Sequence, residues 1–584
     1  MREPSRTLAG VILVASFLAL AVWSWGRWTD PVIDFGFELY VPWRILEGEV
    51  LYRDIAYRNG PLSSYWNAAL FAMFGVSLRT LVFANLATLA AITLLLFDLL
   101  ERSLSRIGAL TGCAAFLAIC AFSQYGTVGN YNFVTPYQHG QTHGLLLGLA
   151  IVSLLSRASR GDGLTRWATA GVLLGLLSLT KVEMWVPAAA VAACATGLEF
   201  HRSGPAARRS ALALTAAALT PPLVAWALLS LAMPGGNAGF AVLGNWPYLW
   251  DALLHQPFYR DTAGFDAPVA NLLETAAACA VLGVAAVGIR ACDRRGRGRS
   301  VGSGAITSVA LIAGGAAGAT LPLPWDALAR ALPVAMLLAV AIWFAPALRD
   351  VSSARTGLLL AGFALLLLAK LGLASQVQHY GFALAAPALA TSLAAAVTPW
   401  QTPLARGLSI GLIAAVASAL LTTAHAIYTE KDHPLGSGAD QILVAGPEAS
   451  PRGVSMERLL RGMDAIMEPD ATLLVLPEGA GVNYWLRRAN PTRYSLFLPT
   501  EQAAHGGPAP MIASLREHPP DFVVLIHRGH EEFGTGPFLS DPRYGEAFHN
   551  WLERGYSPVQ QIGAPPFQGA AFGIVVLQRR AASP

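Results

Sequence analysis

The chain has 584 residues, of which 54% are hydrophobic and only 13% are charged. Soluble domains carry about 25% charged residues, so this composition excludes an ordinary soluble protein. The formal net charge of +4 is too small for a nucleic-acid-binding protein of this length. The distribution of basic residues is therefore informative only when individual loops are compared.

Apolar runs long enough to span a bilayer recur along the first 430 or so positions and predict about thirteen transmembrane helices. The first run lacks a small-residue cleavage site, because Trp23, Trp25 and Trp28 follow it. We therefore expect a retained helix rather than a removed signal peptide. The predicted helices lie near residues 8–25, 78–100, 107–123, 142–156, 167–181, 185–198, 211–233, 269–290, 304–321, 328–348, 357–374, 382–398 and 407–427.

The loops between these runs alternate in charge. The basic loops read MREPSR, ERSLSR, SRASRGDGLTR, EFHRSGPAARRS, RACDRRGRGRS and LRDVSSAR. The loops in between are aromatic and neutral or acidic; they cover residues 30–75, 124–140, 235–268, 322–326 and 375–381. The positive-inside rule then predicts a multi-pass protein of a bacterial-type plasma (inner) membrane, with a cytoplasmic N-terminus. Residues 30–75 and everything after 427 are expected on the extracytoplasmic side.

The composition changes after residue 427, which divides the chain into a polytopic domain, 1–427, and an extracytoplasmic domain, 428–584. Short β-branched runs predict strands at 441–445, 472–476, 522–526 and 573–577. Amphipathic runs predict helices at 455–467, 481–489, 509–517 and 544–555. This alternation predicts a small α/β domain with a mostly parallel sheet. Because it has neither GxGxxG nor a P-loop, we do not expect it to bind nucleotides.

The segment from residue 30 to residue 75 is too polar to cross a bilayer and too aromatic to be a solvated linker. Asp34 and Glu38 are four residues apart, so a helix would place both carboxylates on one face. A carboxylate in partly apolar surroundings has a raised pKa and is a better base near neutral pH. The alternative is that both are ordinary solvated loop acids. The surrounding aromatic residues favour a pocket lining; they are Phe35, Phe37, Tyr40, Trp43 and Tyr52.

Further polar residues at the outer membrane surface are candidates for binding a phosphate or a sugar. Lys181 and Glu183 fall at the outer end of a predicted helix, where ionisable residues are costly and usually functional. The alternative is an interfacial pair that snorkels. Lys370, near the outer end of a later helix, is also placed to face such a cavity. The other candidates are Asp54, Arg58, His139, His143, His379 and Tyr380.

His139 and His143 are spaced like metal ligands, but no HExxH motif accompanies them. We expect them to hydrogen-bond to phosphate or sugar, and we predict no cofactor, although a divalent metal stays open. The five cysteines lie in or beside apolar runs without metal-ligand spacing, so neither disulfides nor a zinc site is expected. The aromatic loop 245–268 is an interfacial lid or, alternatively, a gate for an acceptor.

The segment 30–75 resembles the first external loop of the GT-C class of membrane glycosyltransferases, such as protein O-mannosyltransferases and the aminoarabinose and galacturonosyl transferases of lipid A. The resembling residues are Asp34, Tyr40, Ile45-Leu46-x-Gly48, Leu51-Tyr52-x-Asp54, Gly60-Pro61-Leu62, Tyr65 and Phe74-Gly75. The resemblance implies a GT-C-like helical fold, a polyprenyl-phosphate sugar donor and Asp34 as catalytic base. In O-mannosyltransferases two acids are adjacent, whereas Phe35 follows Asp34 here, so the pattern assigns no role to Glu38.

The sequence therefore predicts an inverting glycosyltransferase that moves a sugar from a polyprenyl phosphate to an acceptor hydroxyl. Asp34 and Glu38 are the catalytic candidates. The expected partners are the lipid-linked donor, a glycan, lipid or protein acceptor, and membrane lipids, but no nucleic acid. Two alternatives are a transporter or flippase of lipid-linked saccharides and a non-catalytic scaffold. Transporters tend to have ionisable residues near the bilayer midplane and broken helices in paired repeats. In this chain the charges gather at the outer membrane surface and no repeat is visible, so a transporter is less favoured.

Overall fold

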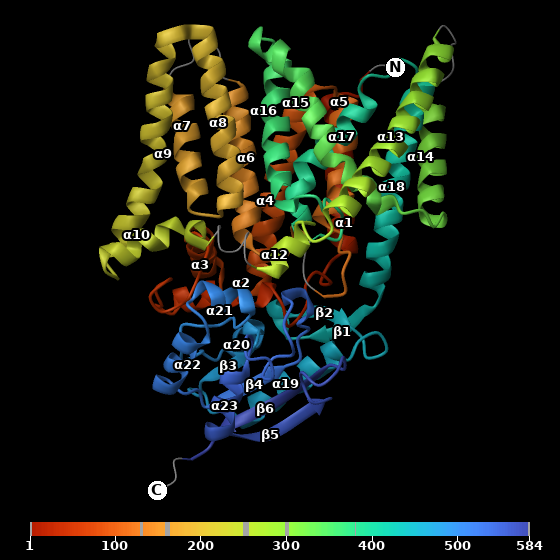
Figure 1. Ribbon diagram of the computed structural model, residues 1–584. Helices are drawn as coiled ribbons and strands as arrows, with labels where there is room; N and C mark the ends of the chain where they lie inside the picture. The colour runs from red at the N-terminus through yellow and green to blue at the C-terminus, as the bar shows by residue number, and fades with distance from the viewer. Residues whose placement is uncertain are drawn as a thin grey trace.

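The computed structural model describes residues 3–128, 132–157, 164–248, 256–297, 303–379 and 381–581. Figure 1 shows a bundle of long helices and, below it, a smaller region of helices and strands built from the end of the chain. Two short helices lie where these parts meet (Figure 1): α2 (Phe35–Leu46) and α3 (Leu62–Phe74). The segment from residue 30 to residue 75 is therefore at the junction.

Each of the predicted apolar runs coincides with one helix of the bundle, in some cases continued by a short 3-10 or π turn. By length and hydropathy, seven helical stretches among the described residues can cross a membrane, one of them containing both α8 and α9, with shorter apolar helices beside them. The bundle helices are α1 (Arg6–Trp23), α4 (Leu78–Ser103), α5 (Arg106–Phe116), α6 (His139–Ser156), α7 (Leu164–Ser178), α8 (Val182–Ser203), α9 (Ala207–Ser230), α13 (Pro268–Gly296), α14 (Ser303–Thr320), α15 (Leu332–Leu348), α16 (Ser352–Leu368), α17 (Ala386–Val397) and α18 (Pro403–Thr429).

Small residues allow some of these helices to pack backbone against backbone. A Cβ atom added to Gly314 or Gly318 of α14 would lie 2.0 Å from the carbonyl oxygen of Gly411 or Ala415 in α18. Lipid tails are as apolar as leucine, so helices in a membrane associate through such close contacts. The alanine- and glycine-rich composition is therefore what lets these helices approach each other.

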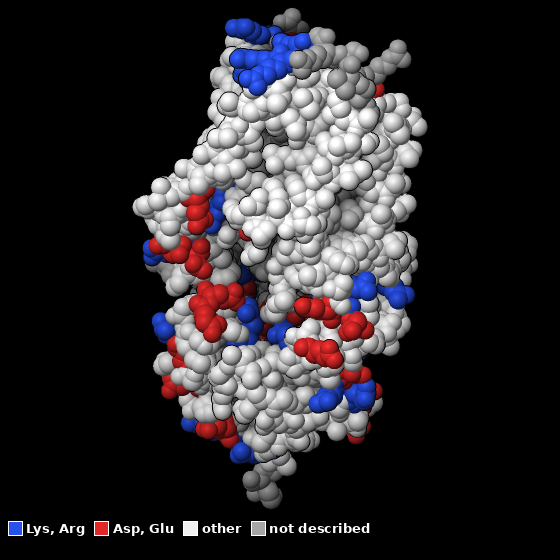
Figure 2. Space-filling model, turned by 90° about the vertical axis from the view of Figure 1, so that its right-hand side faces the viewer, with Lys and Arg blue, Asp and Glu red and all other residues white. Residues whose placement is uncertain are grey.

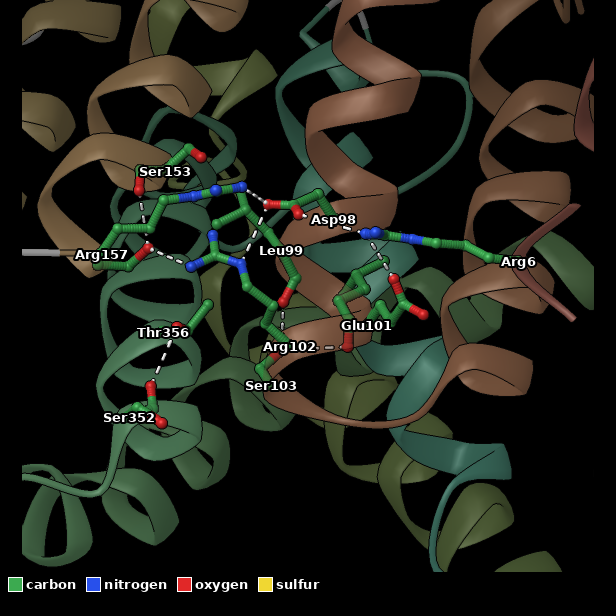
Figure 3. A network of polar contacts seen from close by, with 12 residues as sticks. Arg6, Asp98, Leu99, Glu101, Arg102, Ser103, Ser153, Arg157, Ser352 and Thr356 are labelled. Carbon is green, nitrogen blue, oxygen red and sulfur yellow. Dashed lines mark hydrogen bonds and ion pairs between the residues drawn. The ribbon is translucent and has the colours of Figure 1, made fainter. Parts of the chain in front are cut away.

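Charge is distributed unequally between the two ends of the bundle. Figure 2 shows Lys and Arg side chains gathered at the end far from the C-terminal region, then a broad band without charge, then mixed charges around the junction. At the basic end, Arg102 and Arg157 donate to the Asp98 carboxylate at 3.0 and 2.6 Å, and Arg6 pairs with Glu101 at 2.9 Å (Figure 3). Arginines thus neutralise these acids, and the pairs join α1, α4 and the end of α6.

The C-terminal region contains two sheets. Strands β1 (Lys431–Leu435) and β2 (Ile442–Ala445) form an antiparallel pair. The larger sheet has the order β3-β4-β6-β5, with β3 (Leu473–Leu476), β4 (Phe522–Ile526), β6 (Gly573–Arg579) and β5 (Tyr556–Gly563). Its helices are α19 (Pro451–Ile466), α20 (Ala480–Leu486), α21 (Pro499–Ala504), α22 (Pro508–Glu517) and α23 (Glu546–Gly555).

The prediction of a mostly parallel sheet is wrong. Only the β3–β4 pair is parallel, and β6 pairs antiparallel with both β4 and β5. The error comes from β5, which the sequence does not reveal because Pro558 and the Gln560-Gln561 pair interrupt any apolar pattern. This strand lies at the edge of the sheet and contains a bulge between Pro558 and Gln560, where such residues are tolerated.

Lys431, the first residue of β1, joins the C-terminal region back to the bundle. Its Nζ donates to the Arg27 carbonyl oxygen at 2.8 Å and to Gln124 Oε1 at 2.7 Å. Only 5% of the residue is exposed. Burial lowers the pKa of its ammonium group from 10.5 to about 8, although Asp30 acts in the opposite direction.

Because the pKa of Lys431 is depressed in the folded state, stability should rise with pH between about 8 and about 10.5. In this window the unfolded chain still binds the proton that the folded chain has begun to lose, so the contribution is lost again as the pH falls. The rise attributable to this residue is about 3 kcal/mol. Unfolding of the purified protein across the window should show it, and Lys431→Met should show a shallower rise. Equal pH slopes in the two proteins would contradict the assignment.

Candidate active site

The segment from residue 30 to residue 75 is hydrogen-bonded to both parts of the molecule. On the bundle side, the Gly60 N–H donates to the carbonyl oxygen of Thr180 at 2.7 Å. On the other side, the Ala56 N–H donates to the carbonyl oxygen of Arg493 at 2.7 Å. The acids predicted to be catalytic are thus carried by a segment fixed from above and below.

Asp34 lies just before α2, in an unusual backbone conformation. Its φ is 64° and its ψ is −85°, and the Phe35 N–H donates to the Ile33 carbonyl oxygen at 3.0 Å. These values describe a γ-turn of the rare, strained kind. Asp34 therefore does not share a helical face with Glu38, as a helix over both residues would require, because α2 begins only at Phe35.

Glu38, in the first turn of α2, pairs with the start of α6. Its Oε2 accepts hydrogen bonds from the His139 backbone N–H at 2.9 Å and from His139 Nδ1 at 2.5 Å. Asn85 Nδ2 lies 3.0 Å from His139 Nε2, so it donates there and leaves the ring proton on Nδ1. Glu38 and His139 are 6% and 0% exposed. The two residues form a buried link between α2 and α6.

Lys181, Glu183 and Lys370 converge at the junction end of the bundle. The Nζ atoms of Lys181 and Lys370 lie 2.8 and 2.7 Å from the same oxygen, Oε1 of Glu183. Lys181 precedes α8 and Lys370 follows α16, so the two lysines are far apart in the sequence although they are close in space. Two ammonium groups share one carboxylate, which leaves one positive charge in excess.

This lysine cluster lies beside the first turn of α6. A Cβ atom on Gly140 would lie 3.2 Å from Lys181 Cγ and 3.8 Å from Ser63 Oγ. Ser63, in turn, lies 3.0 Å from His143 Nδ1. The partial positive charge of the α6 N-terminus is already met by Glu38, which accepts the His139 N–H, so the excess positive charge that favours a further anion here comes from Lys181 and Lys370.

Contacts connect the lysine cluster to the turn at Asp34. The Phe35 ring, next to Asp34 in sequence, lies 5.7 Å from the ring of His139, and His139 directly precedes Gly140. Glu38, His139, His143 and the lysine cluster are therefore connected around the first turn of α6, and Asp34 lies one residue before Phe35, which packs against this group.

Two residues of the cluster were missed by the sequence analysis. Tyr137 OH lies 3.4 Å from Lys181 Nζ, and the ammonium lies 5.2 Å from the tyrosine ring centre. Asn245 Nδ2 lies 3.4 Å from Glu183 Oε2, on the oxygen that the lysines leave open. Neither residue belongs to a spaced motif, although each lies in an outer loop that the sequence marks as aromatic, 124–140 for Tyr137 and 245–268 for Asn245.

Arg58 lies at the junction, but it is engaged with the C-terminal region. Its guanidinium forms an ion pair with Glu501 of α21. His505 is also near this carboxylate, with Nε2 3.9 Å from Glu501 Oε2. A phosphate would have to compete with Glu501 for Arg58. Tyr259 lies between Arg58 and the lysine cluster, since it hydrogen-bonds Arg58 and interacts electrostatically with Lys370.

Asp54 makes local contacts, whereas His379 bonds to Thr262, 117 residues away in the sequence, and interacts electrostatically with Lys370. Asp54 accepts from Arg53 at 2.7 Å and from the Val50 N–H at 2.8 Å, and the Arg53 hydrogen bond lowers the pKa of Asp54. His379 donates from Nε2 to the Thr262 carbonyl oxygen at 2.5 Å and accepts the Gly381 N–H on Nδ1 at 2.8 Å. Burial lowers the pKa of His379 to about 4, so this histidine is neutral.

Tyr380, predicted as a binding residue, lies outside the described residues. Within the described ranges, no group of three or more His, Cys, Asp or Glu side chains is arranged to hold a metal ion. His139 and His143, with rings 5.7 Å apart, instead bond to Glu38 and Ser63.

No protein-family model matches the sequence, and no protein of curated function matches it. The fold is similar to that of ArnT from Cupriavidus metallidurans bound to undecaprenyl phosphate, with 14% identity, 98% of each chain covered and a TM-score of 0.44. It is also similar to the Archaeoglobus fulgidus oligosaccharyltransferase in complex with Zn and sulfate, with 14% identity, 96% of this chain and 72% of that chain covered, and a TM-score of 0.49. Both are GT-C glycosyltransferases, the class that the loop at residues 30–75 resembles.

Proposed function

We propose that this chain is an inverting glycosyltransferase of the GT-C type, which moves a sugar from a polyprenyl phosphate to an acceptor hydroxyl. The observation that carries the proposal is the convergence of Lys181 and Lys370 on Glu183, beside the segment that holds Asp34. An anion site of this kind, at the membrane surface and next to a candidate base, fits a phosphate-bearing lipid.

The proposed reaction consists of one proton transfer and one displacement. Asp34 accepts the proton of the acceptor hydroxyl, and the hydroxyl oxygen attacks the anomeric carbon from the face opposite the phosphate. The bond from that carbon to the phosphate oxygen breaks, and the electron pair leaves with the phosphate. The lysine ammonium groups stabilise this developing charge, which is where preorganised donors contribute most.

In this proposal Glu38 is a positioning residue rather than a second catalytic acid. One oxygen of its carboxylate, Oε2, accepts hydrogen bonds from both the backbone and the ring of His139. Through this pair it fixes the first turn of α6 against α2. His139 is then a structural link, while Ser63, which lies beside Gly140 and hydrogen-bonds His143, is assigned with His143 to a phosphate or a sugar.

The orientation follows from the charge asymmetry of the bundle. The basic end in Figure 2 is assigned to the cytoplasm by the positive-inside rule. The junction, with the lysine cluster and Asp34, is then extracytoplasmic, as are residues 428–584. A polyprenyl-phosphate donor would enter from the outer leaflet of a bacterial-type plasma membrane.

The direct test is sugar transfer by the purified full-length protein in nanodiscs. A panel of undecaprenyl phosphates carrying radiolabelled sugars is offered with an extract of envelope glycans and lipids. We expect release of undecaprenyl phosphate with the label in a new product. Movement of intact labelled lipid across a vesicle membrane, without cleavage of its sugar–phosphate bond, would instead identify a flippase.

A further inference from the structure

The γ-turn at Asp34 needs an explanation, because a residue with a side chain rarely adopts it. A positive φ of 64° is uncommon outside glycine, and such conformations persist only where the surrounding structure determines them from several sides. They cluster at functional sites, where strain can hold a side chain in one direction.

On the N-terminal side, the turn is held by Asp30. Its Oδ1 accepts the backbone N–H groups of Val32 at 2.9 Å and Ile33 at 3.0 Å. These bonds fix the peptide of Ile33, whose carbonyl oxygen closes the γ-turn by accepting from Phe35. The position of the Asp30 carboxylate therefore determines where the Asp34 side chain begins.

Asp30 is itself held by the C-terminal region. Arg452, in the first turn of α19, donates from its terminal nitrogen to Asp30 Oδ1 at 2.9 Å and from Nε to Oδ2 at 3.3 Å. Two parallel bonds from a planar guanidinium fix both the distance and the orientation of a carboxylate. The guanidinium also lies 4.9 Å from the ring centre of Phe572, and Asp30 is only 5% exposed.

On the C-terminal side, the turn is held by a backbone contact with the same region. A Cβ atom on Gly36 would lie 2.5 Å from the backbone N and Cα of Gly481 in α20. Pro31 is also close to α20, because a Cβ atom on Gly481 would lie 3.3 Å from the carbonyl oxygen of Pro31. Asp34 is thus bracketed by contacts that come from the C-terminal region.

We infer that Arg452 is a positioning residue for catalysis, which holds the Asp34 carboxylate in its reactive direction through Asp30. The inference rests on the proposed role of Asp34 as base. The C-terminal region then contributes to catalysis by positioning the base, although this region supplies no group that touches the reacting atoms.

The test compares Arg452→Met with Arg493→Met in the full-length protein. Arg493 also crosses the junction, since its terminal nitrogen donates to the Tyr52 carbonyl oxygen, but it does not contact the turn. A misplacement of about 1 Å can cost about a hundredfold in rate. We expect kcat to fall about ten- to a hundredfold in Arg452→Met, with the donor KM and the affinity for undecaprenyl phosphate changed less than about twofold. Arg452→Lys should recover part of kcat, and Arg493→Met should resemble the wild type.

Asp30→Asn gives an independent measurement. The asparagine Oδ1 can still accept from Val32 and Ile33, but it loses the charge that orients Arg452. The two changes act through one link, so the Arg452→Met/Asp30→Asn double variant should be no slower than the slower single variant. Multiplicative losses would show that the two residues act separately and would overturn the inference.

The inference and the proposed function fail in different ways. If Asp34→Asn is inactive while Arg452→Met keeps kcat within twofold of the wild type, Arg452 does not position the base, and the proposed function stands. The inference is also overturned if Arg452→Met loses turnover and undecaprenyl phosphate binding together and Arg452→Lys recovers neither. Arg452 would then only maintain the fold. A wild-type protein that transfers no sugar from any donor would refute the proposed function itself.

Discussion

Asp34→Asn should lower the rate of sugar transfer by about 10²- to 10⁴-fold, the range typical of a lost general base. Asparagine has nearly the same shape and, like aspartate, tolerates a positive φ better than most residues, so the γ-turn should survive. What is lost is the ability to accept the proton of the acceptor hydroxyl. Turnover measured with saturating labelled donor in nanodiscs gives the effect on kcat.

Binding of undecaprenyl phosphate should be unchanged in Asp34→Asn, because the lysine cluster is intact. Glu47→Gln is a matched control, since Glu47 follows the same helix α2 but is exposed. It should transfer sugar at the wild-type rate. If Asp34→Asn did so as well, the base would have to be another group, and Glu38 would be the next carboxylate to test.

Lys181→Met and Lys370→Met should each weaken the binding of undecaprenyl phosphate by about ten- to a hundredfold. A hydrogen bond to a charged group contributes about 1.5–3 kcal/mol, which corresponds to this range in Kd. Salt should change the effect only slightly, because the Lys181 and Lys370 side chains are 8% and 30% exposed and buried charges are screened little. Titration of the lipid phosphate into protein in nanodiscs measures it directly.

Glu183→Gln is a control in which the affinity for undecaprenyl phosphate should change in the opposite direction. Glu183 competes with a phosphate for both lysines, so its neutralisation should leave the affinity equal or make it tighter. A variant that binds less tightly would show that the cluster is an internal ion pair of the fold. Weaker binding in the lysine variants and in Glu183→Gln together would argue against a phosphate site.

The helical bundle is the part that the sequence predicts best. A bilayer requires long apolar runs, and every run in the chain became a helix at nearly the predicted place. The lysine cluster was also predictable in part, since ionisable residues near membrane depth are costly. Their convergence was not, because Lys370 reaches Glu183 from a helix 187 residues away.

The details of the site escaped sequence analysis for physical reasons. The turn at Asp34 depends on Asp30 and Arg452, which are 422 residues apart and belong to no motif. The pairing of Glu38 with His139 likewise joins two helices that no spacing connects. The sheet direction was mispredicted because an edge strand can contain proline and glutamine. Each of these features is set by tertiary contacts, which local patterns do not contain.

The bracketing of Asp34 by late parts of the chain has a consequence for biogenesis. Residues near position 34 emerge from the ribosome first, whereas Arg452 and Gly481, in the proposed orientation, are synthesised and exported only after the whole bundle has been inserted. A newly made chain should therefore stay inactive until its last quarter has crossed the membrane and folded. Catalytic competence would then report that translocation is complete.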